Sequence, residues 1–170
     1  TQVANDPALD PFLQDADLDG RSFNSFMRDC ATFSAVYGHV WVMVDKPATQ
    51  VSTRAEELSQ EIRPYVSIIT PENVIDWQYM RKPNGVYALS SITLLDGIDN
   101  NTAYYRTITA TETTIYTRTN QQQEASIVDV IPNPIGAVPC LPVYAGRTQT
   151  KGIGISDIAD IADMQRALYL

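Results

Sequence analysis

The segment from residue 65 to residue 131 constrains the fold most, because it is a succession of short runs separated by turn residues. Each run is rich in β-branched and aromatic residues, which favour strands. The runs cover residues 65–69, 76–81, 86–95, 103–109, 113–119 and 125–131. Asn84-Gly85 is the strongest hairpin signal in the chain, and Asp96-Gly97 is a second turn sequence. We therefore expect a meander of antiparallel strands over this segment.

A helix and a buried strand are predicted before the meander. Ser22 is placed to cap the helix, and Gly38 is placed to end it. The apolar stripe of this helix has the spacing of one helical face and consists of Phe23, Phe26, Met27, Cys30, Phe33, Ser34 and Tyr37. Residues 39–45 (HVWVMVD) form a nearly continuous apolar run, which is typical of a strand buried on both faces.

Three further elements complete the predicted order. The capping-box pattern at Thr53 and Glu56 predicts a short exposed helix over residues 54–62. Four prolines between residues 131 and 147 predict an extended connector with at most an edge strand. Ser156 is placed to cap a final helix. One side of that helix is marked by Ile158, Ile161, Ala162, Gln165 and Leu168. The predicted fold class is α+β: helix, strand, helix, antiparallel β-meander and a C-terminal helix.

The patterns divide the chain into three parts. Residues 1–21 are polar, acidic and interrupted by proline, so we expect an N-terminal arm or loop without a regular element. Residues 22–147 form the α+β domain, and residues 148–170 form a hinge and the start of a helix. A chain of 170 residues suits one core. It begins without Met and ends inside an apolar-periodic run, so we expect a piece of a longer protein.

Charge and cysteine usage exclude several functions. Twelve basic and twenty acidic residues give a net charge of -8, the wrong sign for tight, static binding to a nucleic-acid backbone. No run approaches the roughly 18 apolar residues that a membrane helix needs, and no signal-peptide pattern is visible, so no membrane partner is expected. Cys30 and Cys140 lie outside metal-binding spacings. We expect two reduced, partly buried thiols of a cytoplasmic product. A disulfide between them stays open as the alternative.

An acidic segment imitates the opening of a calcium loop. Asp15, Asp17 and Asp19 alternate before Gly20, as they do where carboxylates converge on the ion. The twelfth position falls on Phe26, where a bidentate Glu is required, and we expect no helix before the loop. The pattern therefore favours an acidic, solvated loop over a weak cation site.

The remaining motifs predict no catalytic centre. His39 is the only histidine and has none of the accompanying signatures of a nucleophilic or zinc site, so we expect a structural role. Gly152-x-Gly154 before a helix lacks the third Gly of a dinucleotide loop and favours a flexible hinge. A carboxylate pair assisted by Trp41 or Trp77 stays open as a glycan-processing alternative. We expect no enzyme activity, no cofactor and no metal.

Several short motifs follow one another in a recognisable order between residues 37 and 170. The run YGHVWVMVDKP ends in Asp and Pro, and RAEEL and RPYVSIITPENVIDWQY follow it. The latter contains a Pro-x-Asn-hydrophobic-x-x-Trp step from Pro71 to Trp77. A Gly hairpin and LSSITLLDG come next, and later LPVY precedes GISDI and a helix. In this order the motifs resemble the portal proteins of tailed bacteriophages, and the resemblance covers residues 22–170.

The resemblance implies a structural subunit of a ring, usually dodecameric, at one capsid vertex of the virion, with host cytoplasm as the site of assembly. Double-stranded DNA would pass through the ring during packaging and ejection, and capsid protein, terminase and head-tail adaptors would contact it. The family carries no catalytic residues. Acidic channel walls would avoid contacts between Lys or Arg and the DNA phosphates, which would hold the DNA in place. No long stem helix, clip or crown is visible, so the chain would represent mainly the wing region.

Two sets of candidate site residues follow from this interpretation. Tyr104, Tyr105 and Tyr116 fall in the β-rich half and are candidate interface residues, with ordinary strand packing as the open alternative. Asp157, Asp160 and Asp163 are candidate acids facing solvent or the channel lumen. Two other functions stay open: a β-rich carbohydrate-binding or hydrolysing module, and another head-tail or adaptor protein of the virion.

Overall fold

The computed structural model describes residues 9–47, 53, 56, 59–60, 62–120 and 124–169. The fold is α+β, as predicted. The helices are α1 (Asp10–Gln14), α2 (Phe23–Tyr37) and α4 (Ala159–Leu168), with a 3-10 turn at Pro71–Asn73. The strands are β1 (His39–Asp45), β2 (Tyr65–Ile69), β3 (Val74–Arg81), β4 (Tyr87–Asp99), β5 (Thr102–Thr109), β6 (Glu112–Thr119), β7 (Ser126–Pro132), β8 (Cys140–Tyr144), β9 (Gly146–Arg147) and β10 (Gly154–Ile155).

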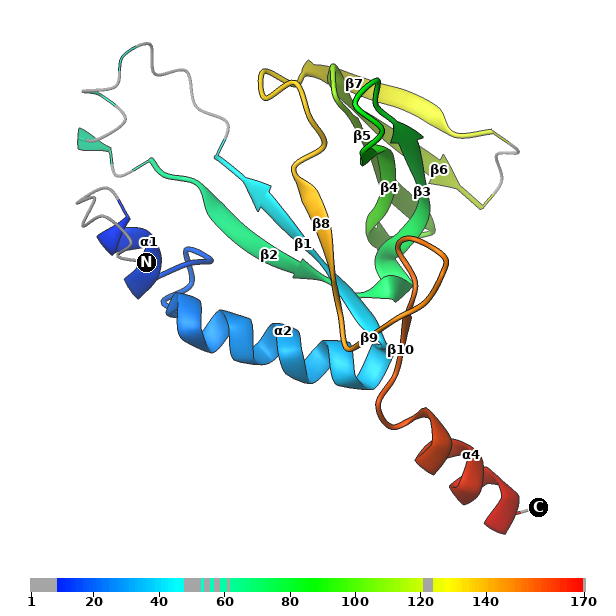
Figure 1. Cartoon of the computed structure of the whole chain (residues 1–170). Coiled ribbons are helices and arrows are strands. Elements are labelled where there is room, and N and C mark those ends of the chain that lie inside the picture. The colour runs from blue at the N-terminus through cyan, green and yellow to red at the C-terminus, as the bar shows by residue number, and fades with distance from the viewer. Residues whose placement is uncertain are drawn as a thin grey trace.

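Three layers form the body of the molecule (Figure 1). The middle layer is a three-stranded antiparallel sheet in the order β2-β1-β8. Helix α2 packs on one face of this sheet, and a five-stranded meander in the order β3-β4-β5-β6-β7 packs on the other. The predicted meander is therefore confirmed for five of its strands. The run 65–69 is a strand, but its assignment to the meander was wrong, because β2 pairs with β1.

Strand β1 lies between the two cores. Successive side chains of a strand point to opposite faces. Val40 and Val42 accordingly pack with Phe26 of α2, whereas Trp41 and Met43 pack against the five-stranded sheet. The first five residues of the strand are buried. The prediction of a strand buried on both faces is confirmed.

Helix α2 begins and ends where the sequence predicted. The Ser22 hydroxyl accepts a hydrogen bond from the Ser25 amide at 3.3 Å, and Gly38 adopts a left-handed φ of 86° at the C-terminal end. Only the centre of the predicted apolar stripe is buried, at Phe26, Cys30 and Ser34. The helix is an outer layer, so the flanks of the stripe remain in solvent.

The second predicted turn of the meander lies elsewhere. Strand β4 continues through Asp96 and Gly97, where the register with β5 shifts, so this dipeptide forms a β-bulge. The chain reverses instead at Asn100 and Asn101, whose φ values of 44° and 69° are both positive. Two positive φ values are what a tight hairpin turn demands, and Asn tolerates them better than other non-Gly residues.

The N-terminal arm is more ordered than expected. Helix α1 occupies part of residues 1–21, so the expectation of no regular element there was wrong. Phe12 of α1 packs on Phe23, with ring centroids 5.5 Å apart. Ala16 is fully buried, and its carbonyl accepts a hydrogen bond from the Val66 amide of β2 at 2.9 Å. The arm therefore closes one side of the core between α2 and β2.

Two predicted elements have mixed outcomes. Thr53 and Glu56 make the reciprocal bonds of a capping box, from the Thr53 amide to the Glu56 carboxylate and from the Glu56 amide to the Thr53 hydroxyl. The rest of the helix predicted over residues 54–62 lies mostly outside the described residues. The proline-rich connector contains β8, an edge strand that pairs Pro142 with Trp41, as expected. It also contains the two-residue strand β9, which was not expected.

Candidate assembly surface

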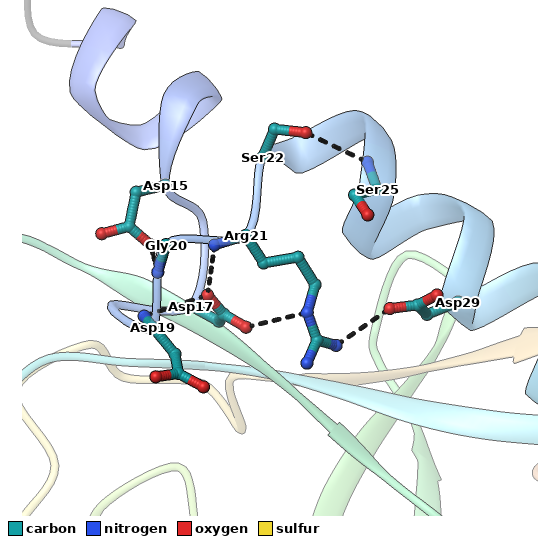
Figure 2. Close-up of polar contacts among 8 residues, drawn as sticks. All are labelled: Asp15, Asp17, Asp19, Gly20, Arg21, Ser22, Ser25 and Asp29. Atoms are coloured by element: carbon teal, nitrogen blue, oxygen red, sulfur yellow. Dashed lines mark hydrogen bonds and ion pairs between the residues drawn. The ribbon is translucent and has the colours of Figure 1, made fainter.

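The acidic segment that resembles a calcium loop is an ordered turn between α1 and α2 (Figure 2). Asp17 Oδ1 accepts hydrogen bonds from the amides of Asp19 and Arg21 at 3.1 and 3.2 Å. Burial acts to raise the pKa of Asp17, but these two amides and the Arg21 charge outweigh it and lower the pKa. Arg21 pairs with Asp17 at 3.3 Å and with Asp29 at 3.0 Å.

The other carboxylates of this turn do not converge on a common point. Asp15 Oδ1 accepts from the Gly20 amide at 2.9 Å, and its Oδ2 pairs with Arg63 at 2.6 Å. A helix precedes the turn, contrary to expectation. Within the described ranges, no three His, Cys, Asp or Glu side chains are grouped as a metal ion would need. The turn is not the freely solvated loop that we expected, because it locks the arm onto α2 and the chain leading into β2.

The single histidine and both cysteines have structural surroundings. His39 is buried and its Nδ1 accepts a hydrogen bond from the Gly154 amide at 3.3 Å, while burial lowers its pKa. Cys30 and Cys140 are unpaired, buried thiols, so the alternative of a disulfide between them is wrong. Burial, the largest cause in both, raises the pKa of Cys30 to about 11 and that of Cys140 to about 12. Neither thiol is activated as a nucleophile.

The tryptophans do not form an exposed platform. Trp41 is fully buried, and Trp77 lies against the same core with its ring centroid 6.0 Å away. Trp77 Nε1 donates to the Lys151 carbonyl at 2.9 Å. This bond fixes the segment before β10, where a Cβ on Gly152 would overlap the Trp77 indole. Gly152-x-Gly154 is therefore closely packed on the domain, which differs from the flexible hinge that we expected.

Helix α4 begins later than predicted. Its N-cap is Ile158, and no side chain caps it. The Ser156 hydroxyl instead donates to the Ala35 carbonyl of α2 at 2.9 Å, because this position lies beside the C-terminal turn of α2. From there α4 projects away from the body, and none of its described residues is buried (Figure 1).

Tyr105 and Tyr116 are brought together on the open face of the five-stranded sheet. They lie directly opposite each other on β5 and β6. Leu95 lies opposite Tyr105, and Ile127 lies opposite Tyr116. Because opposite residues of antiparallel strands share a face, these four side chains form one row across four strands, here called the tyrosine row. Leu95 follows the buried Leu94, so the row faces away from the core.

A threonine row flanks the tyrosine row. Thr93, Thr107 and Thr114 are cross-strand partners, and the hydroxyls of Thr93 and Thr107 are 2.9 Å apart. Tyr104 alternates with Tyr105 and lies on the other face of β5, 39% exposed. The structure thus unites two of the three predicted tyrosines and separates the third.

Strand β7 extends the apolar surface to the edge of the sheet. It pairs with β6 on one side only, and all seven of its residues are exposed. Ile127 and Val128 are 64% and 61% exposed, and Val130 and Ile131 are also open. An exposed, hydrophobic edge strand is a template for pairing unless a partner covers it. The tyrosine row and β7 together form what we call the assembly surface.

The three candidate acids are all exposed, but they do not all lie on the same helix. Asp160 and Asp163 lie on α4, and Asp157 lies just before it. All three are exposed. The apolar residues Ile161, Met164 and Leu168 of α4 are exposed as well.

Among the described residues, no helix is long and apolar enough to cross a membrane.

No protein-family model and no curated protein matches this sequence. The surfaces of the chain itself are therefore the basis for its function. Sequence reasoning identified Tyr105 and Tyr116 by residue type, but it missed Leu95 and Ile127, which join them only through strand register. The apolar residues of β7 come in two adjacent pairs, Ile127-Val128 and Val130-Ile131, so alternation along the strand gave no signal for which side chain joins the row.

Proposed function

We propose that this chain is the wing region of a portal subunit of a tailed bacteriophage, a structural protein that assembles with copies of itself into a ring at one capsid vertex. In the virion the ring would form the channel for packaging and ejecting double-stranded DNA. Capsid protein, terminase and head-tail adaptors would dock on it. The role is structural and not enzymatic, and needs no cofactor.

The assembly surface is the observation that carries this proposal. Protein interfaces combine aromatic, apolar and polar side chains. The tyrosine row, in which Ile127 is exposed and Leu95, Tyr105 and Tyr116 are half-buried, has the threonine row along one side. Tyr is among the residues that contribute most to binding energy when covered. The edge strand β7 adds unpaired backbone groups and four exposed apolar side chains. A surface of this kind favours permanent contact with another protein.

The charge and the order of motifs support the same proposal. A net charge of -8 suits a channel component past which DNA slides, because cationic walls would retain phosphates. The motif order of residues 22–170 supplies the specific family. Helix α4, exposed on all sides, is placed to continue toward a stem.

Native mass spectrometry and negative-stain imaging of the full product that carries this chain test the proposal. We expect closed rings of about a dozen copies with a central channel, the usual stoichiometry of the family that the motifs resemble. A monomer that persists at high concentration would overturn the proposal. A glycan-binding screen would then test the carbohydrate alternative.

A further inference from the structure

A strongly basic surface lies at the opposite edge of the five-stranded sheet from β7. It consists of Arg81 at the end of β3, Lys82 in the β3–β4 turn, and Arg147 and Lys151 around the β9–β10 loop. All four are exposed, and we call them the basic edge. The segments 77–95 and 133–152, which contribute these residues, contain no Asp or Glu. In a chain of net charge -8 this is a local reversal of sign.

Aromatic rings hold the basic edge in place. Lys151 Nζ lies 4.8 Å from the ring centroid of Tyr87, and the Arg81 guanidinium lies 5.9 Å from the same ring. Arg147 lies 5.4 Å from the ring centroid of Tyr144. Cation–π contacts orient a cation without neutralising its charge. The basic edge is thus preorganised and still attracts an anion.

Three arginines elsewhere in the chain are neutralised internally. Arg21, Arg63 and Arg106 each pair with at least one aspartate. No ion pair that the structure shows among its described residues includes a member of the basic edge. The attraction of this edge is therefore directed outward, toward another molecule.

The opposite edge of the sheet carries the complementary charge. Asp129 lies on β7, Glu112 begins β6 opposite the end of β7, and Glu124 precedes β7. All three are exposed. Strands β3 and β7 run in the same direction, because four antiparallel pairings separate them and an even number of reversals restores the direction. Arg81 and the Glu112 end of β7 thus lie toward the same end of the sheet.

We infer that the basic edge of one copy docks on the β7 edge of a second copy, head to tail. This inference rests on the proposed function and names the partner of the assembly surface. A contact between two different edges is heterologous, and repetition of such a contact closes a ring when the rotation per copy divides a full turn without a rise along the axis. Both edges keep the same strand direction, and Asp129 is level with Val74 across the ladders. A shift of the second copy along the strands by a few residues therefore brings Arg81 and Lys82 opposite Glu112 and Asp129 of that copy.

Charge reversal of each edge tests the inference. One variant carries Lys82→Glu and Lys151→Glu, and a second carries Glu112→Lys and Asp129→Lys. We expect each variant alone to lose rings in native mass spectra, because like charges then face each other across the contact. Mixed in equal amounts, the two variants are expected to form rings of alternating copies, with an even copy number. Arg28→Glu, on the exposed face of α2, serves as the control and should assemble as the wild type does.

Each outcome is decisive. Rings from either variant alone, with unchanged salt sensitivity, would overturn the inference and leave the proposed function intact. Normal assembly with reduced retention of duplex DNA would also overturn it, and would assign the basic edge to a phosphate backbone. A wild-type monomer would overturn the proposed function and this inference with it. Unchanged circular dichroism of both variants excludes misfolding as the cause of lost assembly.

Discussion

Gly38 and Gly154 pack backbone against backbone where α2 passes into β1. A Cβ on Gly154 would overlap the Gly38 carbonyl oxygen, and a Cβ on Gly38 would lie 2.6 Å from the Gly154 carbonyl oxygen. The Gly154 amide also donates to His39. The β10 segment is therefore joined to the N-terminal half of the core by a contact that permits no side chain.

Gly154→Ala should lower the free energy of unfolding by about 1–3 kcal/mol, the usual cost of overpacking. The backbone of Gly38 or Gly154 must move to admit the methyl group. Urea unfolding followed by circular dichroism measures the loss. Gly146→Ala is the matched control, because its Cβ would meet Ile155 at an ordinary 3.4 Å. Equal stability of the two variants would contradict the close contact.

The free energy of unfolding should decrease as the pH is lowered, because His39 is buried in its neutral form. Burial between Trp41 and Tyr144 lowers the pKa of His39 from its ordinary value of 6.5. Below pH 6.5 the unfolded chain therefore takes up a proton that the folded chain still excludes, so the free energy of unfolding decreases as pH falls. Above pH 6.5 this contribution is fully present.

Urea unfolding of the wild type and of His39→Asn between pH 5 and pH 8 measures this contribution. The Asn side chain retains an acceptor for the Gly154 amide but does not titrate. We expect the wild type to lose more stability than the variant as the pH falls through 6.5. Parallel pH profiles would show that His39 is not the group responsible.

Both thiols should resist modification in the folded protein. Cys30 and Cys140 are buried, and burial raises their pKa to about 11 and about 12, so almost no thiolate exists at pH 8. Titration with a chromogenic disulfide should detect no fast-reacting thiol in the native state. Unfolding in urea should expose two. A fast native reaction would place at least one thiol at the surface.

Calcium should produce no binding heat at micromolar concentrations. The carboxylates of Asp15 and Asp17 already accept amide hydrogen bonds and pair with Arg63 and Arg21. A bound ion would have to displace those arginines. Isothermal titration calorimetry at pH 7 measures this directly, with a calcium chelator as the competing control. Saturable heat that the chelator abolishes would show that the turn binds calcium and would contradict this prediction.

Ile127→Asp should weaken assembly severalfold by placing a charge at the end of the tyrosine row. Ile127 is 64% exposed in the isolated chain, so the substitution costs little folding stability. Analytical ultracentrifugation over a concentration series measures the shift. Val36→Asp, on an exposed position of α2, makes the same change of charge away from the sheet. Equal association of both variants would exclude the row from the interface.

Local pattern was sufficient to predict the fold class and most strands, because period and turn chemistry are encoded over a few residues. It was insufficient at Asp96-Gly97, since Asn100-Asn101 also tolerates the positive φ values of a hairpin turn and strand pairing places the turn there. The tyrosine row depends on the register of four strands, and the docked Gly152 and Gly154 depend on contacts with residues over 70 positions away. Sequence distance hides such contacts.

The Ala35 carbonyl near the end of α2 accepts both the Ser156 hydroxyl and the Asp157 amide, each at 2.9 Å. Carbonyls in the last turn of a helix lack partners in their own helix, so these bonds meet a need that α2 already has. The chain is thereby held to α2 at Ser156 and Asp157, three and two residues before α4 begins. A force on α4 would act on α2 and β1 as a torque, and the projecting helix would behave as a lever on the core instead of a tether.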